Sequence, residues 1–239
     1  MNMIKIRKTI ICIATAALAL ASCQMDDTLY YNNMTMGNVV DGKFVTDQGN
    51  TFNVVEQVCS GTLGNQKRVM TLCDVLDETS SNEYDVRLTT FFPVLDKKPV
   101  ALEEATDAEI AVQDPVYIEQ MWFSGGYINM MIKTFLKTGS KEKHLINLVY
   151  SKDEEGKYIF NLRHNAYGEV WSEENKSQVA ISGGSYVSFP IADIIKEDKA
   201  QIVLNWKWYL DTDMDYDFKT EKDYSFGYNW ERKGFIQKF

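Results

Sequence analysis

Apolar and polar residues alternate along most of this chain, and a period of two predicts β-strands rather than helices. In the first half, short turns rich in Gly, Asn and Asp, such as "DQGNT" and "TLGNQK", separate the alternating stretches. Five strands are predicted there, at residues 36–40, 43–46, 51–56, 68–75 and 84–92. This many short strands within about 60 residues is typical of a small Greek-key barrel such as an OB-fold.

A polar segment from Lys97 to Pro115 follows the fifth strand and marks the predicted domain boundary. Within it, "ALEEATDAEIA" predicts one or two helical turns. Seven more strands are predicted, at residues 116–123, 127–135, 144–150, 158–163, 186–190, 201–208 and 224–231. Their number and spacing favour an Ig-like β-sandwich. We therefore expect an all-β protein with an OB-like barrel at 35–113 and a β-sandwich at 114–239.

The first 22 residues have the layout of a secretory signal peptide. Lys5, Arg7 and Lys8 form a cationic head, and an uncharged apolar run extends from Ile10 to Leu20. This run is too short for a transmembrane helix, which needs about 20 apolar residues. Residues 1–22 are therefore expected to be removed and to play no part in the fold.

The cysteine of "LASC" resembles that of a bacterial lipobox, where the thiol is acylated and the cysteine becomes the new N-terminus. We expect Cys23 to anchor the protein to a lipid bilayer, because two or three acyl chains attach stably. Residues 23–34 would form a tether. The alternative is an ordinary secretory cleavage beside an incidental cysteine. The following "QMDD" resembles the acidic export signal of Bacteroidota lipoproteins, which favours the outer membrane and its cell-surface side over its periplasmic side.

The charge of the chain excludes one class of partner. Cleavage after residue 22 would remove three basic residues and no acidic ones, so the net charge would change from −9 to −12. Nucleic-acid affinity depends largely on Lys and Arg side chains that neutralise phosphates. Nucleic acid is therefore not an expected partner.

Two cysteines remain in the predicted mature domains, Cys59 and Cys73. They are symmetric about residue 66, so a hairpin folded there would place both on one face. Two thiols outside the cytoplasm can be oxidised. The sequence is compatible with a disulfide between them and with two small buried thiols.

The two histidines of the chain lie in one predicted hairpin, because "HLINLVY" and "YIFNLRH" flank the turn "SKDEEGK". A turn centred on residue 154 would set His144 opposite His164. Such a pair could begin a zinc site, but a zinc site needs at least three protein ligands and no third one can be assigned. The other interpretation is a hydrogen-bonded pair that caps the core.

Two further stretches are candidate ligand-binding sites. Aspartates occupy alternate positions from 211 to 217, but an EF-hand loop starting at Asp211 would need Gly where Tyr216 stands and Glu where Lys222 stands. A solvated acidic loop is expected instead. Trp206 and Trp208 alternate on one strand face, where they would form a sugar-stacking platform if exposed and core if buried.

No motif for an enzyme emerges. The sequence lacks a G-x-S-x-G elbow, a phosphate-binding loop and a dinucleotide-binding fingerprint. The carboxylate pairs Glu103–Glu104 and Glu173–Glu174 lie in polar segments with nothing visible to separate their pKa values. We therefore predict a non-enzymatic protein without a cofactor.

The segments "YDVRLTTFFPVLDKKPV", "WFSGGYINMMIK" and "HLINLVYSKDEEGKYIFNLRHNAYGEVW" resemble the NigD-like family of Bacteroidota lipoproteins, which takes its name from a bacteriocin operon. The "LRHNAYG" block is the most distinctive part. The resemblance implies an OB-like domain followed by a β-sandwich, and it implies no catalytic residues. Three hypotheses follow: a binding module for a protein or glycan partner, an immunity-type protein of a bacteriocin system, and a hydrolase of surface glycans.

Overall fold

The computed structural model describes residues 34–211 and 216–232 of the 239-residue chain. The predicted signal peptide, the acylated Cys23 and nearly all of the predicted tether lie outside these residues. Residues 212–215, within the run of alternating aspartates, lie outside them too. No helix among the described residues is long and apolar enough to cross a bilayer.

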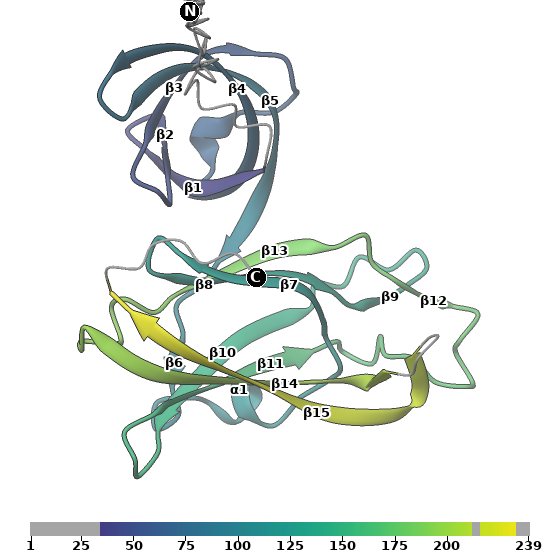
Figure 1. The fold of residues 1–239 in the computed structure, drawn as a ribbon. Helices are drawn as coiled ribbons and strands as arrows, with labels where there is room; N and C mark the ends of the chain where they lie inside the picture. Colours follow the sequence, from purple (N-terminus) through teal and green to yellow (C-terminus); the bar gives the residue numbers. More distant parts are fainter. Residues whose placement is uncertain (1–33, 212–215, 233–239) are drawn as a thin grey trace, which may run out of the picture. The chain divides into compact units, whose positions relative to one another are not determined.

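The first five strands close into a barrel (Figure 1). Their bounds are β1 (Thr35–Val40), β2 (Lys43–Thr46), β3 (Thr51–Gln57), β4 (Arg68–Ser80) and β5 (Glu83–Asp96). β1 pairs with β2 and β4, and β5 pairs with β4 and, in parallel, with β3. The order β1-β2-β3-β5-β4-β1 is that of an OB-like barrel, so this part of the predicted fold is confirmed.

Alternating side chains fill the barrel because every second residue of each strand points inward. Three aromatic rings meet edge to face at the centre: the ring centroid of Phe52 lies 5.8 Å from that of Phe44 and 5.9 Å from that of Tyr84. Val86 pairs with both β3 and β4 and is fully buried. Register shifts in β3 and β4 beside it bend these strands, as closure requires.

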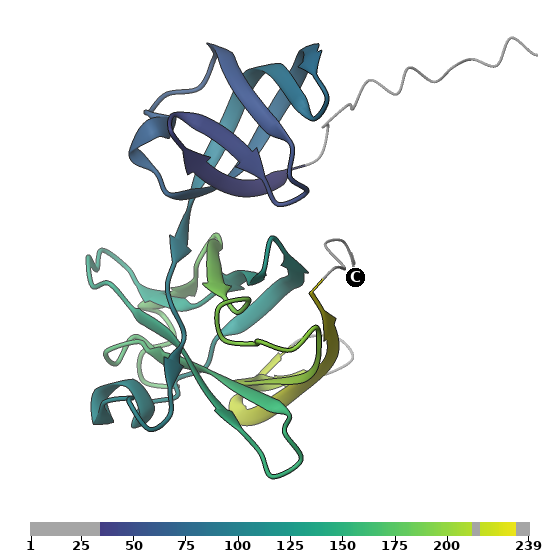
Figure 2. The same ribbon diagram turned by 90° about the vertical axis from the view of Figure 1, so that its left-hand side faces the viewer.

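β5 continues beyond the barrel into a second group of strands (Figure 2). Its end pairs in parallel with β13 (Ser185–Pro190), Val94 opposite Tyr186. β13 in turn pairs with β8 (Tyr127–Lys133), and β8 with β7 (Tyr117–Ser124). The barrel strands and these three strands therefore form one continuous eight-stranded sheet.

A buried polar network lies on this sheet. The Arg68 guanidinium is almost fully enclosed and makes two hydrogen bonds to the Asp47 carboxylate, of 2.7 Å and 2.9 Å. It also donates to Asn129 and Ser188, and it lies 3.8 Å from the centre of the Tyr127 ring. The network satisfies the buried charge on every side, which is the condition for a buried ion pair to be tolerated.

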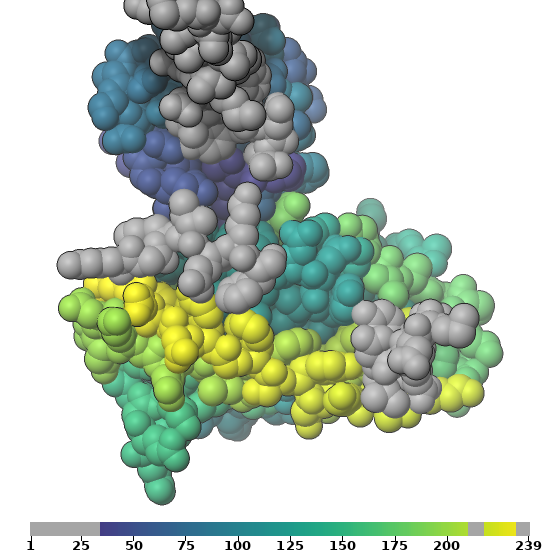
Figure 3. All heavy atoms as spheres, in the orientation of Figure 1, coloured from purple at the N-terminus to yellow at the C-terminus, as the bar shows by residue number. Residues whose placement is uncertain are grey.

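A five-stranded sheet packs against β7, β8 and β13 to complete the sandwich (Figure 1). Its order is β15 (Tyr216–Glu231), β14 (Lys199–Asp211), β11 (Tyr158–Asn165), β10 (Leu145–Lys152) and β6 (Val100–Ala101). β15 runs across the face of the sandwich displayed in Figure 3. Fully buried Ile128, Leu148, Phe160, Phe189 and Leu204 belong to the shared core. The predicted β-sandwich is therefore confirmed.

Some elements were not expected from alternation. β6, β9 (Phe135–Lys137) and β12 (Val179–Ile181) have only two or three residues, too few to show a period. The pairs β11–β14, β10–β6 and β13–β5 are parallel, whereas an Ig-like sandwich is antiparallel. The expected helical turn is present as α1 (Asp107–Ile110), and both α1 and β6 contact β10. The domain limits 35–113 and 114–239 remain a prediction.

Candidate functional site

The two histidines meet, although not through the predicted register. β10 and β11 form the expected hairpin, but His164 is opposite Ile146 and Leu148 is opposite Leu162. The prediction that His144 pairs with His164 is therefore wrong by a slip of two residues, which keeps the same face inward. His144 lies just before β10, and its Nδ1 is 3.0 Å from Nε2 of His164.

The hydrogen bonds of this pair have fixed directions. The Pro115 carbonyl, 2.9 Å from Nδ1 of His164, can only accept, so this nitrogen carries the proton. Burial, and then the nearby His144, lower the pKa of His164 to about 4, so the ring is neutral at pH 7. Its Nε2 therefore accepts, and Nδ1 of His144 donates.

His144 reaches Glu169 with its other nitrogen, 3.4 Å from a carboxylate oxygen. Hydrogen bonds from the Ser140 hydroxyl and the Lys137 amide lower the pKa of Glu169, so the group is a carboxylate and can only accept. The result is a largely buried chain of three groups, in which the side chains of His144 and Glu169 are 7% and 8% exposed.

This arrangement does not create a metal site. The facing nitrogens of His144 and His164 bind each other rather than a shared ion. No group of three His, Cys, Asp or Glu side chains among the described residues could hold a metal ion. The zinc interpretation of the two histidines therefore has no third ligand within the described part of the chain.

The residues after His164 form a tight turn in which Tyr167 is an unusual residue. The amide of Glu169 donates to the Ala166 carbonyl at 2.9 Å, and Tyr167 and Gly168, between them, have φ of 50° and 85°. Two central residues with positive φ define a type I′ turn, where Asn-Gly or Asp-Gly is strongly preferred. A bulky residue such as tyrosine is rare in this conformation and strained.

The strained turn is firmly anchored. The Asp114 carboxylate accepts from the Ala166 amide at 2.7 Å, and the Asn165 side chain accepts from the Tyr167 amide at 2.9 Å. Ala166 and Glu169 are buried, whereas Tyr167 is 54% exposed. The backbone is therefore fixed while the tyrosine ring points to solvent.

Beside this ring lies an open hollow of about 460 Å³, here called the Tyr167 hollow. Eight residues from two loops line it: Lys137, Thr138, Gly139, Ser140, Glu142, Tyr167, Gly168 and Glu169. The Glu169 carboxylate ties the two loops together, because it accepts from the Lys137 amide at 2.9 Å. Glu169 therefore connects the lining of the hollow to the two histidines.

The hollow can bind a ligand, but its chemistry does not favour bond cleavage. A glycosidase acid needs a raised pKa, and the pKa of Glu169 is lowered. His164 is neutral, with both of its nitrogens engaged. Sequence reasoning found the histidines but missed Glu169 and Tyr167. Tyr167 could have been noticed because it stands before Gly168, where a type I′ turn usually has Asn or Asp. No feature of the sequence pointed to Glu169.

Of the two interpretations of Trp206 and Trp208, the core interpretation is the one that holds. Trp208 is buried with Phe135 and Tyr209. Trp206 is half-buried and stacks on Tyr224, with ring centroids 5.5 Å apart. The pair therefore contributes to the packing of the sandwich rather than to an exposed sugar-binding surface.

Cys59 and Cys73 are both free thiols. The hairpin expected about residue 66 is wrong, because β3 and β4 are not neighbours and β4 pairs instead with β1 and β5. Cys73 is buried in the barrel core and Cys59 packs at its edge. Burial raises the pKa of the Cys73 thiol to about 11.

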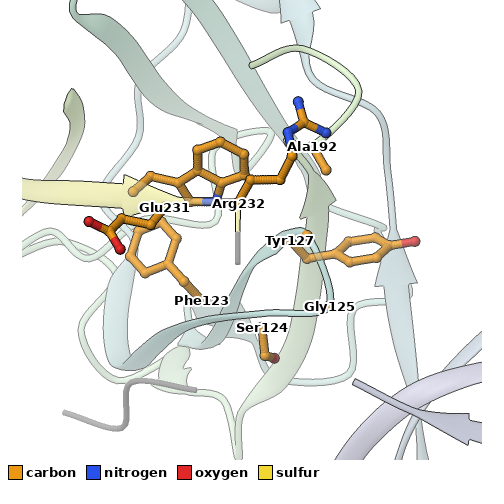
Figure 4. A pocket seen from close by; sticks show the side chains of 9 residues that line it. Phe123, Ser124, Gly125, Tyr127, Ala192, Glu231 and Arg232 are labelled. Carbon is orange, nitrogen blue, oxygen red and sulfur yellow. The ribbon is translucent and has the colours of Figure 1, made fainter. Parts of the chain in front are cut away.

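A second pocket, of about 160 Å³, lies at the turn between β7 and β8 (Figure 4). Phe123 and Glu231 line it, and Tyr127 points away from both of them. Its charged side chains are engaged, Glu231 with Lys199 and Arg232 with the Ile195 carbonyl. It is smaller than the Tyr167 hollow and offers fewer groups for a ligand.

Solved structures from three Bacteroides species are among those that share the fold. A protein of unknown function from Bacteroides vulgatus ATCC 8482 has 21% identity and a TM-score of 0.59, over 87% of this chain and 95% of that chain. A NigD-like immunity protein from Bacteroides caccae ATCC 43185 has 16% identity and a TM-score of 0.63, over 84% and 97%. A candidate lipoprotein from Bacteroides fragilis NCTC 9343 has 13% identity and a TM-score of 0.56, over 82% and 96%. At these identities the likeness concerns the fold alone.

No curated protein sequence matches the chain. A family model does: the NigD-like C-terminal beta sandwich domain matches residues 98–220, from just after β5 into the first residues of β15. The match covers the Tyr167 hollow completely and spans just over half of the sequence. The chain therefore belongs to the NigD-like family, as the resemblance of its sequence predicted.

Proposed function

We propose that this protein is a lipid-anchored, non-enzymatic binding module that holds a protein or glycan partner through the Tyr167 hollow. One observation carries the proposal: a tyrosine in a strained conformation is kept exposed beside the hollow. Backbone strain of this kind costs about 1–3 kcal/mol and clusters at sites with a function. An aspartate in the matching turn at Asp41–Gly42, with φ of 51° and 77°, avoids it.

A supporting feature is the rigidity of the hollow. The Tyr167 turn is anchored by Asp114 and Asn165, and the facing loop is anchored by the Lys137–Glu169 bond. The amide of Thr138 donates to the Gln178 carbonyl at 2.7 Å. A preformed site loses little conformational entropy on binding, which favours affinity.

The location of the protein is part of the proposal. Cys23 would carry the acyl chains, and the acidic residues after it would direct the protein to the cell-surface side of the outer membrane. Labelling of growing cells with a palmitate analogue tests the anchor, with Cys23→Ser as the unlabelled control. Protease treatment of intact cells tests the orientation, because a periplasmic protein would be protected.

Partner binding is tested by photocrosslinking in intact cells. A photoreactive phenylalanine analogue in place of Tyr167 is expected to give a discrete crosslinked product. The same analogue in place of Phe92, an aromatic residue 45% exposed and outside the hollow, is the matched control. Identical products from both positions, or none from position 167, would rule out the hollow as the binding site.

A second candidate function is immunity to a bacteriocin. It is supported by the family and by the similar structure from Bacteroides caccae, which is that of a NigD-like immunity protein. Expression in a bacteriocin-sensitive strain should then raise survival in the presence of the toxin. If survival does not change while the protein is anchored and folded, the immunity hypothesis is wrong.

The hydrolase hypothesis predicts release of reducing ends from surface glycans. The lowered pKa of Glu169 argues against it, since a glycosidase needs one carboxyl group that stays protonated near neutral pH. Release of reducing sugar by the wild type, lost in Glu169→Gln, would restore this hypothesis and overturn the non-enzymatic proposal.

A further inference from the structure

We infer that the Tyr167 hollow takes a neutral sugar unit of a glycan, stacked on the Tyr167 ring. This inference rests on the proposed binding function and adds the chemical class of the ligand. It depends on three properties of the hollow: the balance of its charges, the mixture of its hydrogen-bonding groups, and the single exposed ring.

The exposed charges in the hollow are one of each sign. Its charged lining residues are Lys137, Glu142 and Glu169. The Glu169 carboxylate is 8% exposed and already accepts from the Lys137 amide, so the exposed charges are those of Lys137 and Glu142, one of each sign. A phosphate or sulfate would face the Glu142 carboxylate, and a cationic group would face the Lys137 ammonium. A ligand without net charge meets neither repulsion.

The hydrogen-bonding groups are both donors and acceptors. Thr138 brings a hydroxyl group, Lys137 brings donors and Glu142 brings acceptors. Ser140 accepts from the Glu142 amide at 3.0 Å, which holds this loop in place. A ligand that carries many hydroxyl groups, each able to donate and to accept, matches such a lining.

The aromatic contribution is one ring. Tyr167 is the one aromatic side chain among the eight described residues that line the hollow. Centres of protein–protein interfaces instead gather several apolar anchors in a dry patch. A pyranose ring offers one apolar face to an aromatic side chain and hydroxyl groups at its edge. The volume of about 460 Å³ falls within the usual range of ligand pockets, about 300–1,000 Å³.

Affinity electrophoresis of the full-length, detergent-solubilised protein tests the inference. Gels are cast with neutral polysaccharides (mannan, galactan, xylan, glucan) and, for comparison, with the anionic polymers heparin and polygalacturonate. Retardation by at least one neutral polymer, and by neither anionic one, is expected. Calorimetry with an oligosaccharide of the retarding polymer then gives the Kd.

Variants at one position separate the ring from the backbone. Tyr167→Asn keeps a residue suited to the turn and removes the ring, so the Kd should rise about tenfold or more. Tyr167→Phe keeps the ring and should bind within about twofold of wild type. Phe92→Ala, which removes an exposed aromatic side chain outside the hollow, should leave the Kd unchanged.

The possible failures are distinguishable. Retardation by no neutral polysaccharide, or equal retardation of wild type and Tyr167→Asn, overturns the sugar inference. If a protein is then crosslinked from position 167 in intact cells, the proposed binding function stands with a different ligand class. If neither glycan nor protein binding depends on Tyr167, both the inference and the proposed function are wrong.

Discussion

Nε2 of His164 lies 3.0 Å from Nδ1 of His144, and the proton between them can come only from His144. This direction follows from the Pro115 carbonyl, which fixes the proton of the neutral His164 ring on Nδ1 and leaves Nε2 as an acceptor. Burial lowers the pKa of His164 from 6.5 to about 4, against the effect of the nearby Asp114. Between pH 4 and pH 6.5, the ring is thus neutral in the folded protein and protonated in the unfolded chain.

Stability should therefore fall with acidification. Below pH 6.5, His164 binds a proton in the unfolded chain but not in the folded protein. The free energy of unfolding therefore decreases until the pH reaches about 4. The full loss is on the order of 3 kcal/mol. Glu169, whose pKa is lowered, adds a further loss below its usual value of 4.5, where the stability from its ionised form disappears.

Urea unfolding at pH 7 and pH 5 measures this dependence. The wild type should lose stability over this interval, and His164→Gln should lose clearly less. His144→Gln is the comparison and should keep most of the pH dependence. Burial is the main cause of the lowered pKa of His164, and it persists in this variant. Equal slopes for the wild type and His164→Gln would contradict the assignment of the neutral ring.

Arg68 is expected to be the most costly single charge to remove. Arg68→Met leaves the Asp47 carboxylate buried without its partner, which should lower the free energy of unfolding by about 3–5 kcal/mol. Arg87→Met is the matched control, because Arg87 is 39% exposed and its pairing with Glu56 contributes about 1 kcal/mol or less. Similar losses for the two variants in urea titrations would show that the buried network adds little.

The turn between β7 and β8 should tolerate no side chain at its first glycine. A Cβ at Gly125 would lie 2.4 Å from a carboxylate oxygen of Asp47, and its φ is 58°. Gly156 has φ of 81° and nothing within 4 Å of such a Cβ, so Gly156→Ala measures the backbone strain alone. Gly125→Ala should therefore be less stable than Gly156→Ala by more than 1 kcal/mol in urea titrations. Equal effects would mean that Asp47 moves aside at little cost.

The strands were predictable from sequence because alternation is a local property. All five barrel strands were found, since each has one buried face and ends at a turn rich in Gly, Asn or Asp. Pairing was less predictable: β3 and β4 are consecutive but not neighbours, because β3 pairs in parallel with β5. β9 and β12 pair across more than 40 residues of sequence, and their short lengths carry no periodic signal.

The candidate site shows the same limit. The histidines were recognised as a pair, because a two-residue slip keeps both on one face. Glu169 was missed, since it reaches Lys137 and His144 from a loop whose path depends on tertiary contacts. Tyr167 conflicts with the local preference of its turn, and such conflicts between local sequence and structure are expected at functional sites.

The reactivity of the two thiols tests whether the disulfide that the sequence allows is formed. In the unbonded protein, Cys59 should react with a maleimide or iodoacetamide much faster than Cys73, which is buried and has a pKa raised to about 11. Mass spectrometry of the protein purified from cell envelopes counts the labelled thiols. Labelling of neither cysteine before reduction, and of both after it, would show that the disulfide forms after all.

Tyr167 should strengthen ligand binding and lower the free energy of unfolding. Tyr167→Asn places the preferred Asn-Gly pair in the turn and should raise the free energy of unfolding by about 1 kcal/mol, because a bulky residue in this conformation costs about 1–2 kcal/mol. The turn at Asp41–Gly42 provides the reciprocal control, since its φ values of 51° and 77° match those of Tyr167–Gly168. Asp41→Tyr should lower stability by a similar amount. If Tyr167→Asn is neutral or destabilising in urea titrations, contacts of the ring offset the strain within the free protein, and a ligand is no longer needed to explain why tyrosine occupies this turn.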